Sequence, residues 1–219
     1  GYNTSEVVQT NEHNYPYDWM RRSGNPTDAL FGFDALGLFE SVDDITNSPV
    51  QYMGIVQEGN IKYTDLNNDG KIEQQIDEKM IGHTSPRYKL GLNLSLKYKG
   101  FGIYLLGVGF LDKDVELRNN IYYHADGNDK YSSYVIDNIW PGSTDNPRLT
   151  TTSTPNDNQR SSYWLVDGSY FKLKNLELSY ELPKGLTEKL FSDQVHVFVR
   201  GVNLFTLSKI VDLDPEQIS

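Results

Sequence analysis

The amino-acid sequence predicts an all-β fold: part of a large antiparallel transmembrane β-barrel with long extracellular loops. Two observations support this prediction. The run from Tyr88 to Tyr98 alternates strictly between apolar and polar or small residues, and the connections between expected strands are short at one end and long at the other. Alternation places all apolar side chains on one face of an extended strand, as a wall between lipid and water requires.

The alternating run defines the first long strand. Its apolar members are Tyr88, Leu90, Leu92, Leu94, Leu96 and Tyr98. A tilted strand of about 9–11 residues crosses a bilayer, and tyrosines at both ends suit the aromatic girdles of a barrel. Lys99-Gly100 predicts a tight reversal into a strand that begins at Phe101. A soluble antiparallel sheet with one wet face alternates in the same way, so this hairpin alone leaves both folds open.

Two further strands are expected near the C-terminus. Phe171 and Leu173 alternate in one phase, whereas Leu176, Leu178 and Tyr180 alternate in the other. A β-bulge near Lys174-Asn175 would absorb this one-residue slip. Pro183 ends the strand, and Thr187 is expected to cap a one-turn helix that reaches Phe191. The strand pattern resumes at Val195 and continues through Phe205.

The lengths of the connections favour the barrel. A polar connection reaches from Phe110 to about Ser162. A structureless loop of that length is uncommon inside a compact soluble domain but ordinary on the outer side of an outer-membrane barrel. We therefore expect 34–87 and 111–162 on the extracellular side, with Lys99-Gly100 and the segment 183–194 on the periplasmic side.

Composition narrows the classes of function. The 219 residues are treated as a single region, 1–219, and no run of 18 apolar residues suggests a transmembrane helix. The absence of cysteine excludes a disulfide framework and thiolate metal sites. A formal net charge of −10 argues against a nucleic-acid partner. The four histidines share no ligand spacing, and the third glycine of a dinucleotide fingerprint is missing after Gly107 and Gly109, so the sequence indicates no enzyme.

One loop has the spacing of metal ligands. In DLNNDGKIEQQID, an EF-hand-like pattern gives six candidate ligands: Asp65, Asn67, Asp69, the Lys71 carbonyl, and Glu73 or Asp77. Gly70 supplies the sharp turn, but position 12 is Ile76 and the acidic Asp77 comes one residue late. The loop is therefore predicted either to hold a structural Ca²⁺ or to form an Asx-rich turn that binds no ion.

Three stretches together resemble the SusC/RagA family of TonB-dependent outer-membrane transporters. They are GNIKYTDLNNDGKIEQQIDEKMIGHTSPRYKLGLNLSLKYKGF (59–101), SYWLVDGSYFKLKNLELSYELPKGL (162–186) and VRGVNLFTLSKIVDLDPE (199–216). Their order and intervals match the C-terminal part of that family's barrel. The resemblance implies a bacterial outer-membrane location and uptake of oligosaccharide or peptide nutrients. It also implies contact with membrane lipid, a SusD-like surface lipoprotein as partner, and TonB acting through a plug domain.

The chain departs from the family pattern in three respects. Nothing in it resembles the plug domain, it stops before the final closing strand, and the late Asp77 breaks the family's calcium-like spacing. The expectation is therefore a fragment of a transporter. The alternative from another class is a soluble, calcium-stabilised β-domain that binds carbohydrate. Burial of the row from Leu90 to Leu96 beneath other parts of a soluble protein would favour that alternative.

Overall fold

The computed structural model describes residues 1–8, 11–118, 133–148, 154–190, 192–210 and 214–217. These residues form two compact units. The sheet unit consists of described residues in Gly1–Asn3, Ser85–Lys113 and Asp167–Ser219, and the loop unit of those in Thr4–Thr84 and Asp114–Val166. No helix in the described part of the chain is long and apolar enough to span a bilayer.

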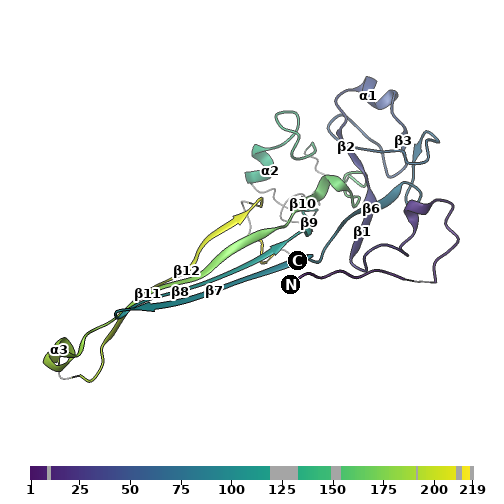
Figure 1. The fold of residues 1–219 in the computed structure, drawn as a ribbon. Coiled ribbons are helices and arrows are strands. Elements are labelled where there is room, and N and C mark those ends of the chain that lie inside the picture. Colours follow the sequence, from purple (N-terminus) through teal and green to yellow (C-terminus); the bar gives the residue numbers. More distant parts are fainter. Residues whose placement is uncertain (9–10, 119–132, 149–153, 191, 211–213, 218–219) are drawn as a thin grey trace. The chain divides into compact units, whose positions relative to one another are not determined.

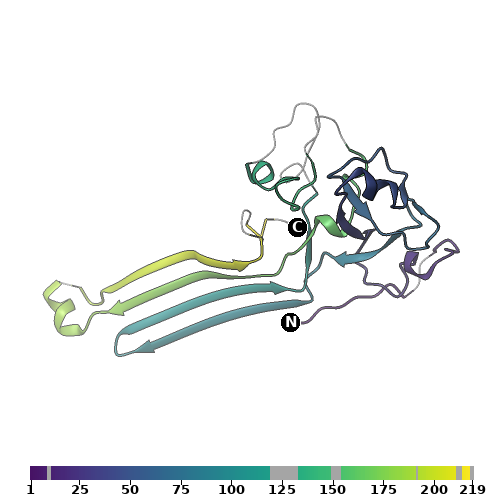
Figure 2. The same cartoon turned by 90° about the horizontal axis from the view of Figure 1, so that it is seen from above.

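The sheet unit is built on four long antiparallel strands in the order β12-β11-β8-β7 (Figures 1 and 2). Their bounds are β7 Tyr88–Tyr98, β8 Phe101–Leu111, β11 Tyr170–Glu181 and β12 His196–Ser208. The two helical turns between β11 and β12 are α3, Lys184–Thr187, and the 3₁₀ helix η3, Glu188–Leu190. All four strands therefore coincide with runs that the sequence predicts to be extended.

The predicted reversal between β7 and β8 is confirmed as a two-residue turn. Lys99 and Gly100 have φ of 48° and 86°, and Tyr98 pairs directly with Phe101. Two positive φ angles are what a type I′ hairpin turn requires. The pairing of Tyr180 with Phe101 and of Glu181 with His196 places the β11–β12 connection at the same end of the sheet as this turn. The two short connections therefore share one end, as the sequence indicates.

The predicted β-bulge in β11 is also confirmed. Leu173 pairs with Gly107 and Asn175 with Leu106, so Lys174 is an extra residue relative to β8. The same position interrupts the register with β12, where Asn203 adopts a φ of 52°. The extra residue restores the phase, because the apolar residues on either side of it then lie on one face of the sheet.

The expected cap at Thr187 is wrong. Helix α3 begins after Pro183, and Thr187 is its last residue, with the hydroxyl donating to the Lys184 carbonyl at 3.1 Å. Pro183 is the N-cap residue in an extended conformation, with φ of −65° and ψ of 147°, and no side-chain hydrogen bond caps the helix. Phe191, the expected helix end, lies outside the described residues.

The loop unit contains short strands and a core of its own. It comprises η1 Asp18–Met20, β1 Ala29–Phe33, β2 Ala35–Leu38, α1 Val42–Thr46, β3 Val50–Gln51, β4 Ile61–Tyr63, β5 Lys71–Ile72, β6 Glu78–His83, β9 Asp114–Glu116, α2 Ser133–Asp137, η2 Ser162–Trp164 and the start of β10, Leu165–Asp167. Strand pairs are β1–β6, β2–β4, β3–β5 and β9–β10. The core residues are Phe33, Leu38, Ile61, Tyr63, Ile72 and Trp164.

Candidate functional site

The four-stranded sheet has one continuous apolar face, which we call the outer face. Direct pairing aligns Leu92 with Gly107, Leu94 with Leu105 and Leu96 with Ile103 across β7 and β8. The face continues across β11 and β12 through Leu176, Leu178, Val197, Val199, Phe205 and Leu207. Residues paired directly in an antiparallel sheet share a face, so the row predicted from β7 extends over all four strands.

The outer face is exposed within the described chain. Leu90, Leu92, Leu94 and Leu96 keep 39–55% of their surface accessible. A sheet of a soluble domain buries such a row in its core, and contiguous exposed apolar surface marks an interaction with a partner or a membrane. The exposed row therefore disfavours the soluble carbohydrate-binding alternative and fits contact with lipid.

Aromatic side chains lie at both ends of the sheet. At the end with the hairpin turn, the rings of Phe101 and Tyr180 are 4.4 Å apart beside Tyr98. At the opposite end, the rings of Tyr2 and Tyr88 are 5.1 Å apart, and Tyr88 belongs to the outer-face row of β7. Strands of 11 to 13 residues between two aromatic zones match the dimensions of a transmembrane β-strand.

The opposite face, here called the inner face, is mainly polar on β7 and contains ion pairs elsewhere. Its β7 positions are Lys89, Gly91, Asn93, Ser95 and Lys97. Across β11 and β12, Glu177 pairs with Arg200 at 2.5 Å. A sheet that is apolar on one side and polar on the other is what a barrel wall between lipid and a water-filled interior requires.

Gly107 and Gly109 allow the ring of Phe171 to lie close to the backbone of β8. A Cβ at Gly107 would stand 2.6 Å from the ring of Phe171, and one at Gly109 would stand 3.1 Å from it. Both glycines lie within β8, so the structure uses them for close packing between strands and not in a dinucleotide-binding turn.

The acidic loop of the loop unit is held by its own carboxylates. Asp65 accepts the backbone N–H of Asn68 at 2.7 Å and that of Gly70 at 2.8 Å. Asn67 donates its amide to Asp69 at 2.9 Å, and Asp69 accepts the N–H of Lys71 at 2.9 Å. These contacts bring four of the predicted ligand residues together in a sequence of Asx turns.

Asp77 closes this loop from its far end. The side chain is buried and accepts the N–H of Leu66 at 2.9 Å and the N–H of Glu73 at 2.8 Å. It therefore connects both ends of the loop through backbone amides. Among the described residues, no group of three or more histidine or acidic side chains has the geometry of a metal site. The binding of calcium therefore stays a prediction. The hydrogen bonds of Asp77 hold the two ends of the loop together without an ion.

A stacked aromatic pair lies beside the acidic loop. The rings of Tyr17 and Trp19 are 4.4 Å apart and nearly parallel. Trp19 donates its indole N–H to the Ile76 carbonyl at 2.9 Å, and the Asn67 amide lies 3.4 Å from the Tyr17 hydroxyl. The sequence shows these aromatic residues but contains no local signal that joins them to a loop about 50 residues away.

A buried polar turn at Asn156 and Asp157 joins distant parts of the loop unit. Asp157 accepts the Ile61 N–H at 2.8 Å and the Asn60 amide at 2.6 Å, and its carbonyl accepts the Trp164 indole N–H at 2.8 Å. Burial raises the pKa of the Asp157 carboxyl, while these hydrogen bonds oppose the shift. Asn60 and Ile61 are more than 90 residues from Asp157 along the chain, so no local sequence motif indicates these two contacts.

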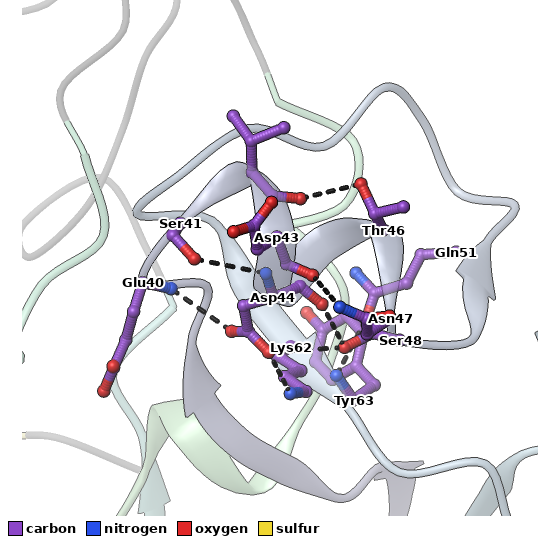
Figure 3. Close-up of polar contacts among 11 residues, drawn as sticks. Glu40, Ser41, Asp43, Asp44, Thr46, Asn47, Ser48, Gln51, Lys62 and Tyr63 are labelled. Atoms are coloured by element: carbon purple, nitrogen blue, oxygen red, sulfur yellow. Dashed lines mark hydrogen bonds and ion pairs between the residues drawn. The ribbon is translucent and has the colours of Figure 1, made fainter.

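Helix α1 is fixed by a second polar cluster, shown in Figure 3. Ser41 accepts the N–H of Asp44 at 3.1 Å, which is the usual role of a serine N-cap. The Asp44 carboxylate pairs with Lys62 on β4 at 2.6 Å, and this hydrogen bond lowers the pKa of Asp44. The cluster therefore joins the helix to the strand that carries the core residues Ile61 and Tyr63.

Two curated proteins of Formosa agariphila are similar to nearly the whole chain. TonB-dependent receptor P3 is 28% identical over 201 residues, and TonB-dependent receptor P26 is 29% identical over 204 residues. The alignments cover 89% and 88% of this chain. The chain is homologous to TonB-dependent receptors. It spans about a fifth of these relatives' length, 19% in each case.

Solved structures agree with this homology in fold. The RagAB peptide importer in the open-open state matches 98% of this chain and 23% of its own, with a TM-score of 0.64 and 17% identity. Its closed-closed state matches with a TM-score of 0.60 and 18% identity. No family model matches the chain.

The homology establishes the class of the fold and its location. The fold is all-β, and the four-stranded sheet is an incomplete part of an antiparallel outer-membrane barrel. The homology therefore indicates a location in the bacterial outer membrane. Its curated relatives are receptors and not enzymes.

Proposed function

We propose that this chain forms part of the barrel wall and the outer loops of a TonB-dependent transporter that imports nutrients. The observation that carries the proposal is the sheet of four strands, each 11 to 13 residues long, which is apolar over one whole face and carries polar and charged side chains of β7, β11 and β12 on the other. Such a sheet separates lipid from a water-filled interior. The homology to TonB-dependent receptors supports the same function.

The proposed cargo is an oligosaccharide or a peptide. The resemblance to the SusC/RagA family implies both classes, and the structural neighbour RagAB is a peptide importer. The proposed partners are a SusD-like surface lipoprotein and TonB acting through a plug domain. Energised transport by the full-length protein would require both the barrel interior and the partner that drives it.

An uptake assay on the full-length protein in its own cells tests this proposal. We expect labelled oligosaccharides or peptides to enter the periplasm only when the protein and TonB are present. A proton uncoupler should abolish entry but leave surface binding intact. Entry that is equally fast in cells lacking the protein would contradict a transport function.

In the proposed orientation, the long segments 34–87 and 111–162 lie on the extracellular side, and the short connections between strands lie on the periplasmic side. Gly185 in α3 is exposed, with no atom within 4 Å of the space that a side chain would occupy. Ser132, in the long connection, lies outside the described residues. Single cysteines at these two positions should react differently with an impermeant maleimide on intact cells. Labelling at Ser132 with protection at Gly185 is expected, and the opposite pattern would reverse the orientation.

We further propose that the acidic loop binds Ca²⁺ as a structural ion. Asp65, Asn67, Asp69, the Lys71 carbonyl and either Glu73 or Asp77 would supply the oxygen ligands. Because the acidic residue comes one place late, we expect an affinity near that of extracellular modules, about 10⁻⁴–10⁻³ M. Calorimetry should show heat for the wild type and much less for Asp69→Ala. No heat from the wild type at millimolar calcium would leave a loop closed by hydrogen bonds alone.

A further inference from the structure

The inner face carries an ion-pair cluster that joins β11 to the segment after β12. The Lys172 ammonium lies 2.8 Å from a carboxylate oxygen of Asp214 and 2.9 Å from one of Glu216. Lys174 reaches the other oxygen of Glu216 at 2.7 Å. Two lysines of one strand are thus neutralised by two acidic residues about 40 positions further along the chain.

The sheet register fixes the face on which this cluster lies. Lys172 pairs with Val108 of β8 and Thr206 of β12, and Val108 pairs in turn with Gly91 of β7. Gly91 stands between Leu90 and Leu92, so its position belongs to the face opposite the leucine row. The Lys172 side chain therefore projects from the inner face, where a lipid-exposed partner cannot reach it.

Two of the described residues after β12 have buried side chains. Ile210 and Pro215 are buried, and the Gln217 N–H donates to the Asp214 carbonyl at 2.9 Å to close a turn. We call Asp214–Gln217 the strap. The strap is seated through a buried proline in addition to its two carboxylates.

Burial and charge make these contacts mutually dependent. The Lys172 side chain is only 5% exposed. A buried ammonium without a carboxylate is strongly unfavourable, and so is a pair of neighbouring carboxylates deprived of their cation. Pairing with Lys172 and Lys174 lowers the pKa of both Asp214 and Glu216 and keeps them ionised.

We propose that Lys172 and Lys174 form a clamp that holds the strap against the inner face of the barrel wall. The strap then lines the transport path beside β11 and does not extend outward as a free loop. The assignment of a transport path to the inner face rests on the proposed function. The clamp itself follows from the ion pairs and the strand register. The clamp also gives a physical reason for the joint occurrence of FKLKN in β11 and DPE after β12.

Cysteine protection in the full-length, membrane-embedded protein tests the clamp. A cysteine at the buried Pro215 reports on seating of the strap, and a cysteine at the exposed Gln217 serves as a reference for reagent access. The backgrounds are the native lysines, Lys172→Met, the conservative Lys172→Arg and Lys89→Met. Lys89 is a matched control, since it is a lysine of the same face for which the described residues show no ion pair. Retained heat-modifiable gel mobility would confirm that each barrel is folded.

We expect the cysteine at Pro215 to react with an impermeant maleimide about tenfold faster in Lys172→Met than in the native background, because local opening becomes easier. Lys172→Arg and Lys89→Met should leave the rate low, since an arginine still pairs with both carboxylates. Equal rates in Lys172→Met and Lys89→Met would overturn the clamp. The readout does not involve nutrient, so failed uptake with the predicted labelling would contradict the proposed function alone.

Discussion

The two units of this chain place their apolar side chains in opposite ways. In the sheet unit, Leu90 to Leu96 leave 39–55% of their surface exposed, whereas in the loop unit Ile61, Ile72 and Tyr63 are at most 1% exposed. The apolar side chains of the two units are therefore arranged for two different surroundings, water and lipid. The loop unit hides apolar surface from water, and the sheet unit presents it to a medium as apolar as itself.

This difference also decides where polar groups are found. The loop unit buries Asp157, Asn156 and Gln51 in a network that joins segments distant in sequence. Within the strands of the sheet unit, the charged pair of Glu177 and Arg200 lies on the inner face. Predictions that distinguish the two units therefore depend on the surroundings of a side chain more than on its residue type.

The largest effect is expected in the loop-unit core. Phe33→Ala removes a ring that is 1% exposed and stacked on Tyr63 at 4.9 Å. A cavity in such a core costs about 3–5 kcal/mol of unfolding free energy. Hydrogen exchange of loop-unit amides in the full-length protein would measure this loss. Leu36→Ala, at a position 62% exposed, is the control and should change protection little. Equal effects of both variants would mean that the loop unit has no core.

The next effect concerns the outer face of the sheet. Leu94→Arg places a cation in the middle of the apolar row and should cost about 2–4 kcal/mol of folding free energy in a bilayer. Asn93→Arg, one residue away on the inner face, should cost far less. Folding titrations into lipid vesicles compare the two, and equal costs would show that the faces do not differ in environment.

A smaller effect is expected at the buried turn of the loop unit. In Asp157→Asn, an N–H₂ group replaces one of the two carboxylate oxygens that accept hydrogen bonds from Asn60 and Ile61. One buried donor is then left unpaired, at a cost of about 1–3 kcal/mol. Asp145→Asn, at an exposed position, is the matched control. Limited proteolysis of the folded protein should cleave the loop unit of Asp157→Asn faster than that of Asp145→Asn. Indistinguishable cleavage would remove the turn from the interactions that hold the unit together.

The smallest effect is at the pair between Asp44 and Lys62. Both side chains are about a quarter exposed, so Lys62→Met should cost at most about 1 kcal/mol. The pKa of Asp44 is below its ordinary 3.8, so its stabilisation is present above that value and is lost as the pH falls through the lowered pKa. Stability of the loop unit at pH 7 and pH 3, followed by hydrogen exchange, should differ less in Lys62→Met than in the wild type. Lys71→Met should keep the wild-type pH dependence.

Much of the sheet could be predicted from the sequence because its signals are local. Alternation predicted the span of β7, the Lys99-Gly100 dipeptide predicted the turn, and the change of phase near Lys174 located the bulge. Asp77 was predicted, as an alternative to Glu73, to complete the ligands of a calcium ion; in the structure its carboxylate accepts the N–H groups of Leu66 and Glu73.

The loop unit could not be predicted in the same way. Its core joins Phe33, Tyr63 and Trp164 across intervals that no periodic pattern covers, so the sequence did not indicate which of these residues pack together. The Asn60–Asp157 and Tyr63–Asn156 hydrogen bonds likewise join residues 97 and 93 positions apart. Such a unit is stabilised by contacts between residues far apart in the sequence, and these contacts produce no local sequence pattern.

The most direct test of the central claim measures what the two faces of β7 contact. Nitroxide labels at Leu94 and Ser95, introduced singly into the full-length protein in lipid bilayers, report collisions with apolar oxygen and with a water-soluble nickel chelate. We predict that the label at Leu94 collides mainly with oxygen and the label at Ser95 mainly with the nickel chelate. Preferential collision of the Leu94 label with nickel, or equal behaviour at both positions, would contradict a lipid-facing outer face.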